Sequence, residues 1–352
     1  MDFLAGKTLE DLKLWLRESG EKEDYAVPLL TGFYRKKMRD IMQIAQLPLS
    51  LRRKLAAAFA DGYYEPSHLM VSADGSRKYL FSAGEKGFVE SVYLPERSRH
   101  TLCVSTQAGC RMGCAFCCTG QSGFRGNLTE REILNQVLSV PESSMLNRIV
   151  FMGMGEPFDN SEALFRVLAI LTASWGLSFG AQKITVSTVG ILPSVLRFLD
   201  ETNCHLALSV HSPFPEERKK WIPAENKFPL KEIILSVGRK GMNRHRRITA
   251  EYVMMAGVND SREHLQELIY LFRGTVFRIN LIPFNPFEGS VVRPSEASAM
   301  QYFMKELNEA GISATIRRSR GTDISAACGQ LGNSLRLSPD CASGASELMR
   351  SG

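Results

Sequence analysis

The chain has 352 residues, 44% of them hydrophobic and 23% charged, which is the composition of a folded globular protein and excludes a disordered chain. No apolar run reaches the roughly 18 residues that a membrane-spanning helix needs, and residues 1–7 lack the basic and apolar regions of a signal peptide. We therefore expect a cytoplasmic protein with no membrane partner. The net charge of +6 favours a polyanionic partner only weakly, because many basic enzymes carry a similar charge.

The first 60 residues are predicted to form a small helical accessory domain. Thr8 and Asp11 have the spacing of a capping box, and the apolar residues that follow keep helical spacing up to Gly20. A second stretch, residues 34–59, carries seven lysines and arginines against one acid, Asp40. A solvated helical face explains this charge as well as a binding surface does.

Residues 61–95 are predicted to form a β-rich extension, because apolar and polar side chains alternate over residues 88–93. From residue 101 on, apolar β-branched runs are mostly separated by helix-like segments, which indicates a parallel sheet with helical crossovers. The expected strands are residues 102–104, 148–154, 183–189, 205–210, 248–254 and 277–282, with a last one at 314–317. The expected helices include residues 130–140, 162–173 and 261–272.

Six strand–helix units are too few to close an eight-stranded barrel. The predicted fold class is therefore α/β, a partial (β/α)6 barrel over residues 96–335 with a small N-terminal helical domain. The last segment, residues 336–352, is predicted to be a flexible tail. In such folds the reactive groups gather where the strands end.

Four of the eight cysteines lie within nine positions, which is too close for a disulfide framework. Cys110, Cys114 and Cys117 form a CxxxCxxC pattern with Phe116 before the last cysteine, directly after the first barrel strand. Three thiolates on a compact loop suit an iron–sulfur cluster that leaves one iron open for chemistry. The alternative is a Cys3His zinc site with His100 or another histidine, although a second CxxC pair is missing.

The CxxxCxΦC loop resembles that of the radical S-adenosylmethionine (radical SAM) superfamily, whose open iron binds the amino and carboxylate groups of the cofactor. The segment 151–157, which contains Gly155 and Glu156, is similar to the glycine-rich GxGEP segment of the same superfamily. Glycines let a backbone approach a ligand closely, and Glu156 could accept a hydrogen bond from the cofactor ammonium.

Further segments resemble one subfamily, the RlmN/Cfr-type RNA adenine methyltransferases. They are residues 89–95 (VESVYLP), 102–107 (LCVSTQ) and 321–331 (GTDISAACGQL), so the resemblance extends from the helical N-terminus to about residue 331. The last segment and the cysteine that precedes the cluster motif are specific to this subfamily. One departure is Cys118, where the family more commonly has serine or alanine, and we expect a bystander thiol there.

The resemblance implies a radical SAM enzyme that methylates carbon 2 of adenosine in 23S ribosomal RNA, and in transfer RNA as well. Cys328 would carry the methyl group as S-methylcysteine, Cys103 would resolve a protein–RNA adduct through a transient disulfide bond, and Glu90 would accept the proton from the base. The implied cofactors are one [4Fe-4S] cluster held by Cys110, Cys114 and Cys117, and two molecules of S-adenosylmethionine per turnover. An electron donor such as flavodoxin or ferredoxin is also implied. Carbon 2 lies between two ring nitrogens and is electron-poor, so radical chemistry suits it better than an electrophilic methyl donor.

Other cofactor contacts are expected by position at the ends of predicted strands: Gly155, Glu156, Ser187, Ser209, Val210, His211 and Asn285. Basic clusters at residues 35–39, 52–54, 218–220, 239–247 and 317–320 fit contacts with RNA phosphates. Because the base must leave its stack to reach a buried radical, an unpaired or flipped adenosine is expected. The N-terminal domain is a candidate for gripping folded RNA.

Three alternatives stay open. Methylation at carbon 8, which confers antibiotic resistance, uses the same cysteine pair. A radical SAM enzyme could act on a substrate other than RNA, and a zinc-dependent RNA-binding module would not be an enzyme at all.

Overall fold

The computed structural model describes residues 2–240 and 246–332. The tail predicted to be flexible, residues 336–352, lies outside the described residues. The strands are β1 (Asp2–Phe3), β2 (Phe59–Ala60), β3 (His68–Val71), β4 (Arg77–Ser82), β5 (Phe88–Glu96), β6 (Arg99–Cys103), β7 (Gln107–Gly109), β8 (Phe124–Asn127), β9 (Arg148–Phe151), β10 (Ile184–Thr188), β11 (His205–Ser209), β12 (Ile248–Met254), β13 (Phe277–Pro283) and β14 (Ala314–Ile316). The helices are α1 (Leu9–Glu18), α2 (Ala26–Leu30), α3 (Leu49–Ala58), α4 (Cys118–Gln121), α5 (Glu130–Leu138), α6 (Ser161–Thr172), α7 (Leu192–Glu201), α8 (Pro215–Trp221), α9 (Leu230–Arg239), α10 (Arg262–Phe272) and α11 (Ala297–Glu309).

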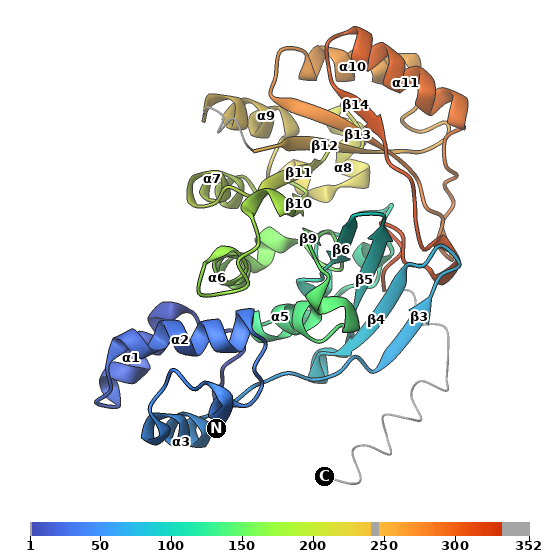
Figure 1. Cartoon of the computed structure of the whole chain (residues 1–352). Helices are drawn as coiled ribbons and strands as arrows, with labels where there is room; N and C mark the ends of the chain where they lie inside the picture. The colour runs from blue at the N-terminus through green and yellow to red at the C-terminus, as the bar shows by residue number, and fades with distance from the viewer. Residues whose placement is uncertain (1, 241–245, 333–352) are drawn as a thin grey trace.

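A ten-stranded sheet in the order β14-β13-β12-β11-β10-β9-β6-β5-β4-β3 forms the body of the molecule. All neighbours from β6 through β14 are parallel, whereas β3, β4, β5 and β6 pair antiparallel. Helices α5, α6, α7, α9, α10 and α11 lie along the outer side of the curved sheet (Figure 1). Because β14 and β3 are the two edges and do not pair with each other, the barrel stays open. The predicted α/β partial barrel is confirmed, with β14 as a seventh parallel strand.

Every barrel strand expected from the sequence is present within a few residues of its predicted bounds. The same holds for the three expected helices, which appear as α5, α6 and α10. One core cluster of buried apolar side chains runs from the N-terminal helices through the barrel. The subdivision into domains stays a prediction.

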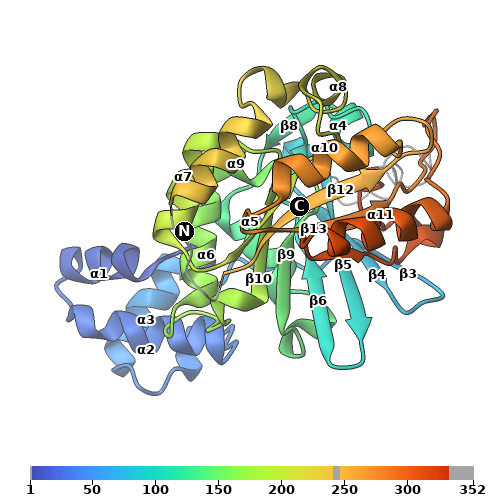
Figure 2. The ribbon, with the colours of Figure 1, turned by 90° about the horizontal axis from the view of Figure 1, so that it is seen from above.

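The N-terminal unit is only partly as expected. Helix α1 begins at the predicted capping box, since the Thr8 side chain accepts from the Asp11 amide and Asp11 in turn accepts from the Thr8 amide. The basic stretch 34–59 is not one helix, because only α3 within it is an α-helix. Asp40 caps a short 3-10 turn by accepting from the Met42 amide, and Pro48 immediately precedes α3, so the chain is interrupted between these residues. Helix α1 lies beside α6, and Asp11 of α1 forms an ion pair with Arg166 of α6 (Figure 2).

In the described part of the chain, none of the helices combines the length and the apolar character that crossing a bilayer requires.

Candidate active site

Two cavities meet inside the partial barrel. The larger has a volume of about 480 Å³ and is lined by residues along the strands from their amino-terminal ends and by the segment that follows β14. The smaller, about 150 Å³, is lined by residues at the carboxyl ends of the strands and by the cysteine loop. Met152, Glu251, Ile282, Arg317 and Cys328 line both cavities. These five residues therefore mark the junction of one passage through the barrel.

The strand pleat decides which side chains reach the larger cavity. Successive side chains on a strand point to opposite faces, so every second residue lies on the lumen side. Residues 247, 249 and 251 of the β12 segment line this cavity, as do residues 278, 280 and 282 of β13 and 148, 150 and 152 of the β9 segment. In β12 and β13 these positions run from arginine at the amino-terminal end through polar side chains to the shared junction.

The three predicted cluster ligands line the smaller cavity. The loop that carries Cys110, Cys114 and Cys117 follows β7, which ends at Gly109 with φ +75°. A Cβ at Gly109 would lie 1.8 Å from the Gly123 carbonyl oxygen, so only glycine permits this close return of the chain. Burial raises the pKa of Cys110 to about 12 and also raises the pKa values of the other two thiols. The protein alone therefore favours neutral thiols, and a bound metal would be needed to hold them as thiolates.

The donor set fits a cluster better than a single ion. No group of three or more His, Cys, Asp or Glu side chains among the described residues is placed to hold one metal ion. Three thiolates on one zinc would need sulfur atoms about 3.8 Å apart, as follows from tetrahedral bonds of about 2.3 Å. In a cubane each thiolate binds a different iron, so its sulfur atoms lie further apart. Cys110, Cys114 and Cys117, which share a cavity without converging on one point, suit this second arrangement.

Glu156 lies at the carboxyl end of the β9 segment and is fully enclosed. Its carboxylate accepts from the Thr188 hydroxyl at 2.6 Å, the Val189 amide at 2.9 Å and the Phe158 amide at 3.1 Å. Burial raises its pKa to about 7, although these hydrogen bonds favour the charged form. Gly155 has φ +96°, and a Cβ there would lie 2.5 Å from Cβ of Gln107. The glycine is thus required for packing against the strand segment beside it.

The other predicted cofactor contacts divide into two groups. Ser187, Ser209 and His211 line the smaller cavity together with the cysteines. Val210 is not among the residues that line either cavity, and Asn285 lines only the larger one, where its side-chain amide donates to the Cys328 carbonyl at 3.0 Å. Asn285 therefore anchors the Cys328 loop in this structure.

His211 is held neutral. Burial lowers its pKa to about 3, and its Nδ1 accepts from the Val253 amide at 3.0 Å. Its backbone has φ +57°, and its ring stands edge-on to Phe116 of the cysteine loop, with 4.4 Å between the ring centroids. The side chain thus packs the strand end of β11 against the cysteine loop.

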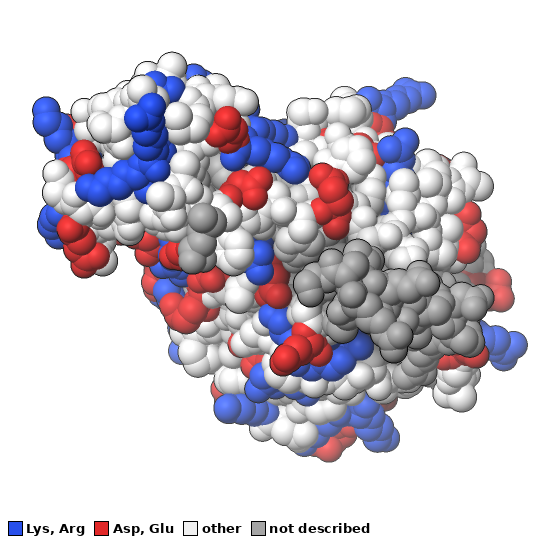
Figure 3. Space-filling model, turned by 90° about the horizontal axis from the view of Figure 1, so that it is seen from below, with Lys and Arg blue, Asp and Glu red and all other residues white. Residues whose placement is uncertain are grey.

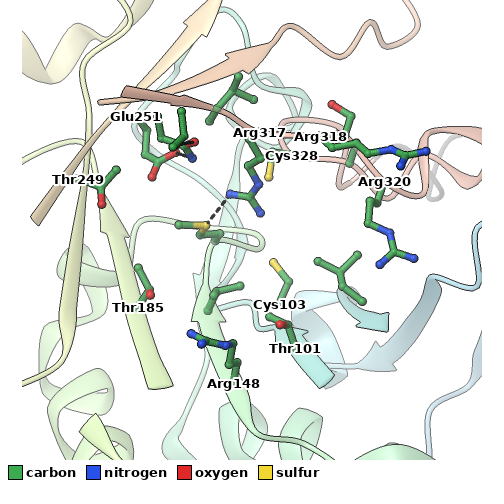
Figure 4. Close-up of a pocket in the computed structure, with 18 of the residues that line it drawn as sticks. Thr101, Cys103, Arg148, Thr185, Thr249, Glu251, Arg317, Arg318, Arg320 and Cys328 are labelled. Atoms are coloured by element: carbon green, nitrogen blue, oxygen red, sulfur yellow. Dashed lines mark hydrogen bonds between the residues drawn. The ribbon is translucent and has the colours of Figure 1, made fainter. Parts of the chain in front are cut away.

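Cys103 and Cys328 come together although 225 positions separate them in the sequence. Both line the larger cavity, and Figure 4 shows both sulfur atoms on its inner side with the Arg317 guanidinium beside them. Burial and, to a smaller extent, the charge of Cys328 raise the pKa of Cys103 to about 12, against the opposing charge of Arg317. The pKa of Arg317 is itself raised, chiefly by the Cys328 thiolate. None of the seven cysteines within the described residues forms a disulfide bond.

The Cys328 loop, residues 326–332, is fastened on several sides. The Cys118 amide donates to the Gly329 carbonyl at 2.8 Å, and the Thr119 hydroxyl donates to the Leu331 carbonyl at 2.7 Å. Helix α4, which follows the cysteine motif, therefore holds the loop in place. The buried Cys118 thiol does not belong to the lining of either cavity.

Glu90 is buried beneath the same loop. Its carboxylate accepts from the Gly332 amide at 3.0 Å, and the Lys78 ammonium lies 3.9 Å from it. Glu90 does not line either cavity, but Val92 and Leu94 on the same face of β5 line the larger one. The structure thus places Glu90 next to the site, with the end of the Cys328 loop over it.

The basic residues expected to contact RNA differ in whether they are buried and in whether they are already paired within the protein. Arg218 is fully buried, forms an ion pair with Glu225 and donates to backbone carbonyls, so its prediction as an RNA contact is wrong. Grouping Arg218 with its sequence neighbours on α8 led to this error, because adjacent residues of a helix lie on different faces. In the N-terminal stretch, Arg52 donates to the Met42 carbonyl and Lys54 pairs with Glu21. Figure 3 shows Lys and Arg side chains interleaved with Asp and Glu on the face it presents.

Sequence reasoning missed Glu251 and the inner position of Arg317. Glu251 lines both cavities and accepts from the Asn280 side-chain amide at 2.8 Å, and burial raises its pKa. The available signal was the carboxylate of Glu251 in the middle of a mostly apolar predicted strand, because burying a carboxylate costs free energy unless it is paired or hydrogen-bonded.

Several known proteins resemble this chain. The model of the radical SAM superfamily matches residues 104–269. A curated protein of Parabacteroides distasonis named "Probable dual-specificity RNA methyltransferase RlmN" is 44% identical over 93% of this chain and 96% of its own length. One of the same name from Heliobacterium modesticaldum is 38% identical over 93% of this chain and 89% of its own. The crystal structure of a radical SAM methyltransferase from Sphaerobacter thermophilus is 37% identical, with a TM-score of 0.86, and the match covers 94% of this chain and 99% of that one.

These matches extend over the barrel, the cysteine loop and the N-terminal unit alike. The chain therefore belongs to the RlmN family of radical SAM RNA methyltransferases.

Proposed function

We propose that this protein methylates carbon 2 of an unpaired adenosine in 23S ribosomal RNA, and in transfer RNA as well, with Cys328 as the methyl carrier. The observation that carries the proposal is the pair of thiols, Cys103 and Cys328, in the cavity that adjoins the cysteine loop. The names of the relatives support RNA as the substrate.

The chain supplies the carrier and the group that releases it. When bound, the [4Fe-4S] cluster and two molecules of S-adenosylmethionine supply a methyl group for one half-reaction and one-electron chemistry for the other. The Cys328 thiolate is the nucleophile that takes up the methyl group, and after hydrogen abstraction the methylene radical adds to carbon 2 of the base. The adduct then loses the carbon-2 proton and one electron, which would pass to the bound cluster. The Cys103 thiolate attacks the Cys328 sulfur, the bond between that sulfur and the methylene carbon breaks, and the carbon takes up a proton to become the methyl group while the two cysteines form a disulfide. A reductant must reopen this disulfide before the next turnover.

Two further side chains support these steps. Arg317 places a positive charge beside both thiols, and this charge opposes the rise in the pKa of Cys103. Glu90 is the proposed acceptor of the proton from carbon 2, and it lies beside the cavity under the Gly332 amide. Its use as a base requires the end of the Cys328 loop to move aside.

The cofactor contacts belong to the same proposal. Cys110, Cys114 and Cys117 would hold the cluster, and Gly155, Glu156, Ser187, Ser209, Val210, His211 and Asn285 are the proposed neighbours of S-adenosylmethionine. An electron donor such as flavodoxin or ferredoxin and a cytoplasmic location complete the proposal.

The test compares two alanine variants under anaerobic conditions with reconstituted cluster, reductant and ribosomal RNA. Cys328→Ala should keep its iron and sulfide but lose methyl transfer to RNA, because the carrier is missing. Cys118→Ala is the matched control, since that buried thiol lies outside both cavities, and it should keep activity. Full activity of Cys328→Ala would contradict the carrier role.

The same assay separates the alternatives. Chromatography against 2-methyladenosine and 8-methyladenosine standards decides between the two ring positions, which use the same cysteine pair. Methylated Cys328 without methylated RNA would indicate a different substrate. A colourless protein that contains zinc and lacks iron and sulfide would indicate the binding module.

A further inference from the structure

The larger cavity opens at the amino-terminal ends of the barrel strands, the opposite end from the cysteine loop. Arg99 begins β6, Arg148 begins β9 and His205 begins β11, while Arg247 directly precedes β12 and Arg278 is the second residue of β13. Because parallel strands start at the same edge of a sheet, these five side chains surround one opening. We call them the arginine mouth. Figure 4 shows Arg148 on the side of the cavity away from Cys328.

The arginine mouth carries positive charge that the protein leaves mostly uncompensated. Seven arginines and two glutamates line the larger cavity. Within the described residues, Arg148, Arg247 and Arg278 have no carboxylate within ion-pair distance, and the nearest acid at the rim, Glu96, pairs with Arg99 at 3.8 Å. The groups also oppose one another: burial lowers the pKa of Arg148, and the charges of Arg99 and Arg247 lower it further. Such repulsion is costly unless an anion relieves it.

The pKa of His205, which lies within the arginine mouth, depends on this positive charge. Burial and, to a smaller extent, the charges of Arg247, Arg148, Arg246 and Arg278 together lower its pKa to about 4. Its Nδ1 accepts from the Arg247 amide at 3.0 Å, which leaves the ring fixed between strands. An anion bound beside it would favour the protonated ring and raise this pKa.

The size and the depth of the cavity indicate which anion enters. About 480 Å³ lies within the range of sites that enclose one nucleotide-sized ligand. In the strand register Thr185 is level with His205 and Thr249 is level with Arg278, so these two threonines lie at the arginine mouth beside the charged groups. Asn280 offers a neutral polar group further in, where it pairs with Glu251 at the junction. A nucleotide with its phosphates outside and its base inside matches this order of charged and neutral groups.

We propose that the target nucleotide enters the barrel through the arginine mouth, and that Arg148, Arg247 and Arg278 bind the RNA phosphates that flank it. The base then meets Cys328 from the side opposite the cysteine loop, so substrate and cofactor occupy the two ends of one passage. This inference rests on RNA being the substrate, as proposed above, and adds the entrance and the residues that hold the backbone.

Binding of a labelled RNA hairpin with an unpaired loop adenosine tests this, with the full chain and its reconstituted cluster. The slope of log affinity against log salt falls by about 0.7–0.9 for each phosphate that the protein no longer neutralises. The triple variant Arg148→Gln/Arg247→Gln/Arg278→Gln should therefore lose about 2 to 3 from the slope, and at least about tenfold in affinity at 0.1 M salt. The Arg→Lys triple should keep most of the slope, which controls for folding. Arg262→Gln, on the exposed first turn of α10 at the other end of the barrel, should leave binding unchanged.

An NMR titration of His205 gives a second reading that needs no turnover. Its pKa should rise on binding the hairpin to the wild type and stay unchanged with the glutamine triple. An unchanged salt slope in a folded glutamine triple would overturn the inference, as would poly-glutamate that competes as well as RNA. If the glutamine triple loses salt slope but the wild type methylates no adenosine, the proposed reaction is contradicted, whereas the proposed RNA entrance is still supported.

Discussion

The buried pair of Arg218 and Glu225 offers the sharpest test of how the fold holds the strand ends of the site. Arg218 donates to the Ser209 carbonyl at 2.8 Å, the Val189 carbonyl at 2.9 Å and the Val210 carbonyl at 3.1 Å, besides its ion pair with Glu225. Arg218→Met leaves a carboxylate that is 2% exposed without its partner. Removing one member of such a pair costs about 3–5 kcal/mol. The carboxyl ends of β10 and β11 should also lose their common anchor.

Urea unfolding of the apo protein, followed by far-UV circular dichroism, measures the free energy of unfolding. Arg218→Met/Glu225→Gln should recover part of the loss, because the buried charge disappears while the three carbonyls stay without a donor at about 1 kcal/mol each. Lys305→Met breaks an exposed pair with Glu309 on α11 and should cost less than about 0.5 kcal/mol. A loss below about 1 kcal/mol for Arg218→Met would show that the buried pair does not anchor these strand ends.

Three further predictions concern the site itself. Cys103→Ala should trap the protein covalently on RNA, visible as a shifted band in denaturing gels, and an active cluster without any adduct would refute its resolving role. His211 has a pKa of about 3 in the folded protein, against 6.5 for an ordinary exposed histidine, so below pH 6.5 the unfolded chain binds more protons and stability falls as the pH falls. His211 alone should lower the free energy of unfolding by about 1.4 kcal/mol between pH 7.5 and 5.5. His211→Asn, which tolerates the positive φ, should remove this part of the pH dependence of stability. Curves of unfolding free energy against pH that run parallel for the variant and the wild type would contradict the prediction. Gly155→Ala should cost more stability than Gly257→Ala in thermal unfolding, because both have positive φ but only the first would meet Gln107; equal losses would speak against the packing role.

The fold could be predicted because its signals are local. Alternating strands and helices, and a capping box at Thr8, each depend on residues near one another in sequence. Asp40 and Pro48 are the local signals of the break in the basic stretch 34–59, because the first caps a short turn and the second immediately precedes α3. Pro48 in particular marks the start of a new helix.

The inner face of the barrel could not be predicted in the same way. Arg247, Thr249 and Glu251 reach the cavity because they occupy alternate positions of one strand, but an isolated strand does not tell which face is the lumen. Arg218 was grouped with Lys219 and Lys220, although the helix directs only Arg218 into the core. A cluster of charged residues in the sequence thus predicts exposed side chains only when it is known which face of the helix or strand each residue occupies.

The role of Cys328 as methyl carrier is tested most sharply by following the methyl group itself. The protein is incubated anaerobically with S-adenosylmethionine that carries a trideuterated methyl group, reductant and ribosomal RNA, and mass spectrometry is applied to the Cys328 peptide and to the nucleosides. We predict a fully deuterated methyl on Cys328 and 2-methyladenosine that retains two of the three deuterium atoms, because one is lost when the carrier carbon becomes a radical. Three retained deuterium atoms in the product, or methylated adenosine without methylated Cys328, would contradict the carrier role.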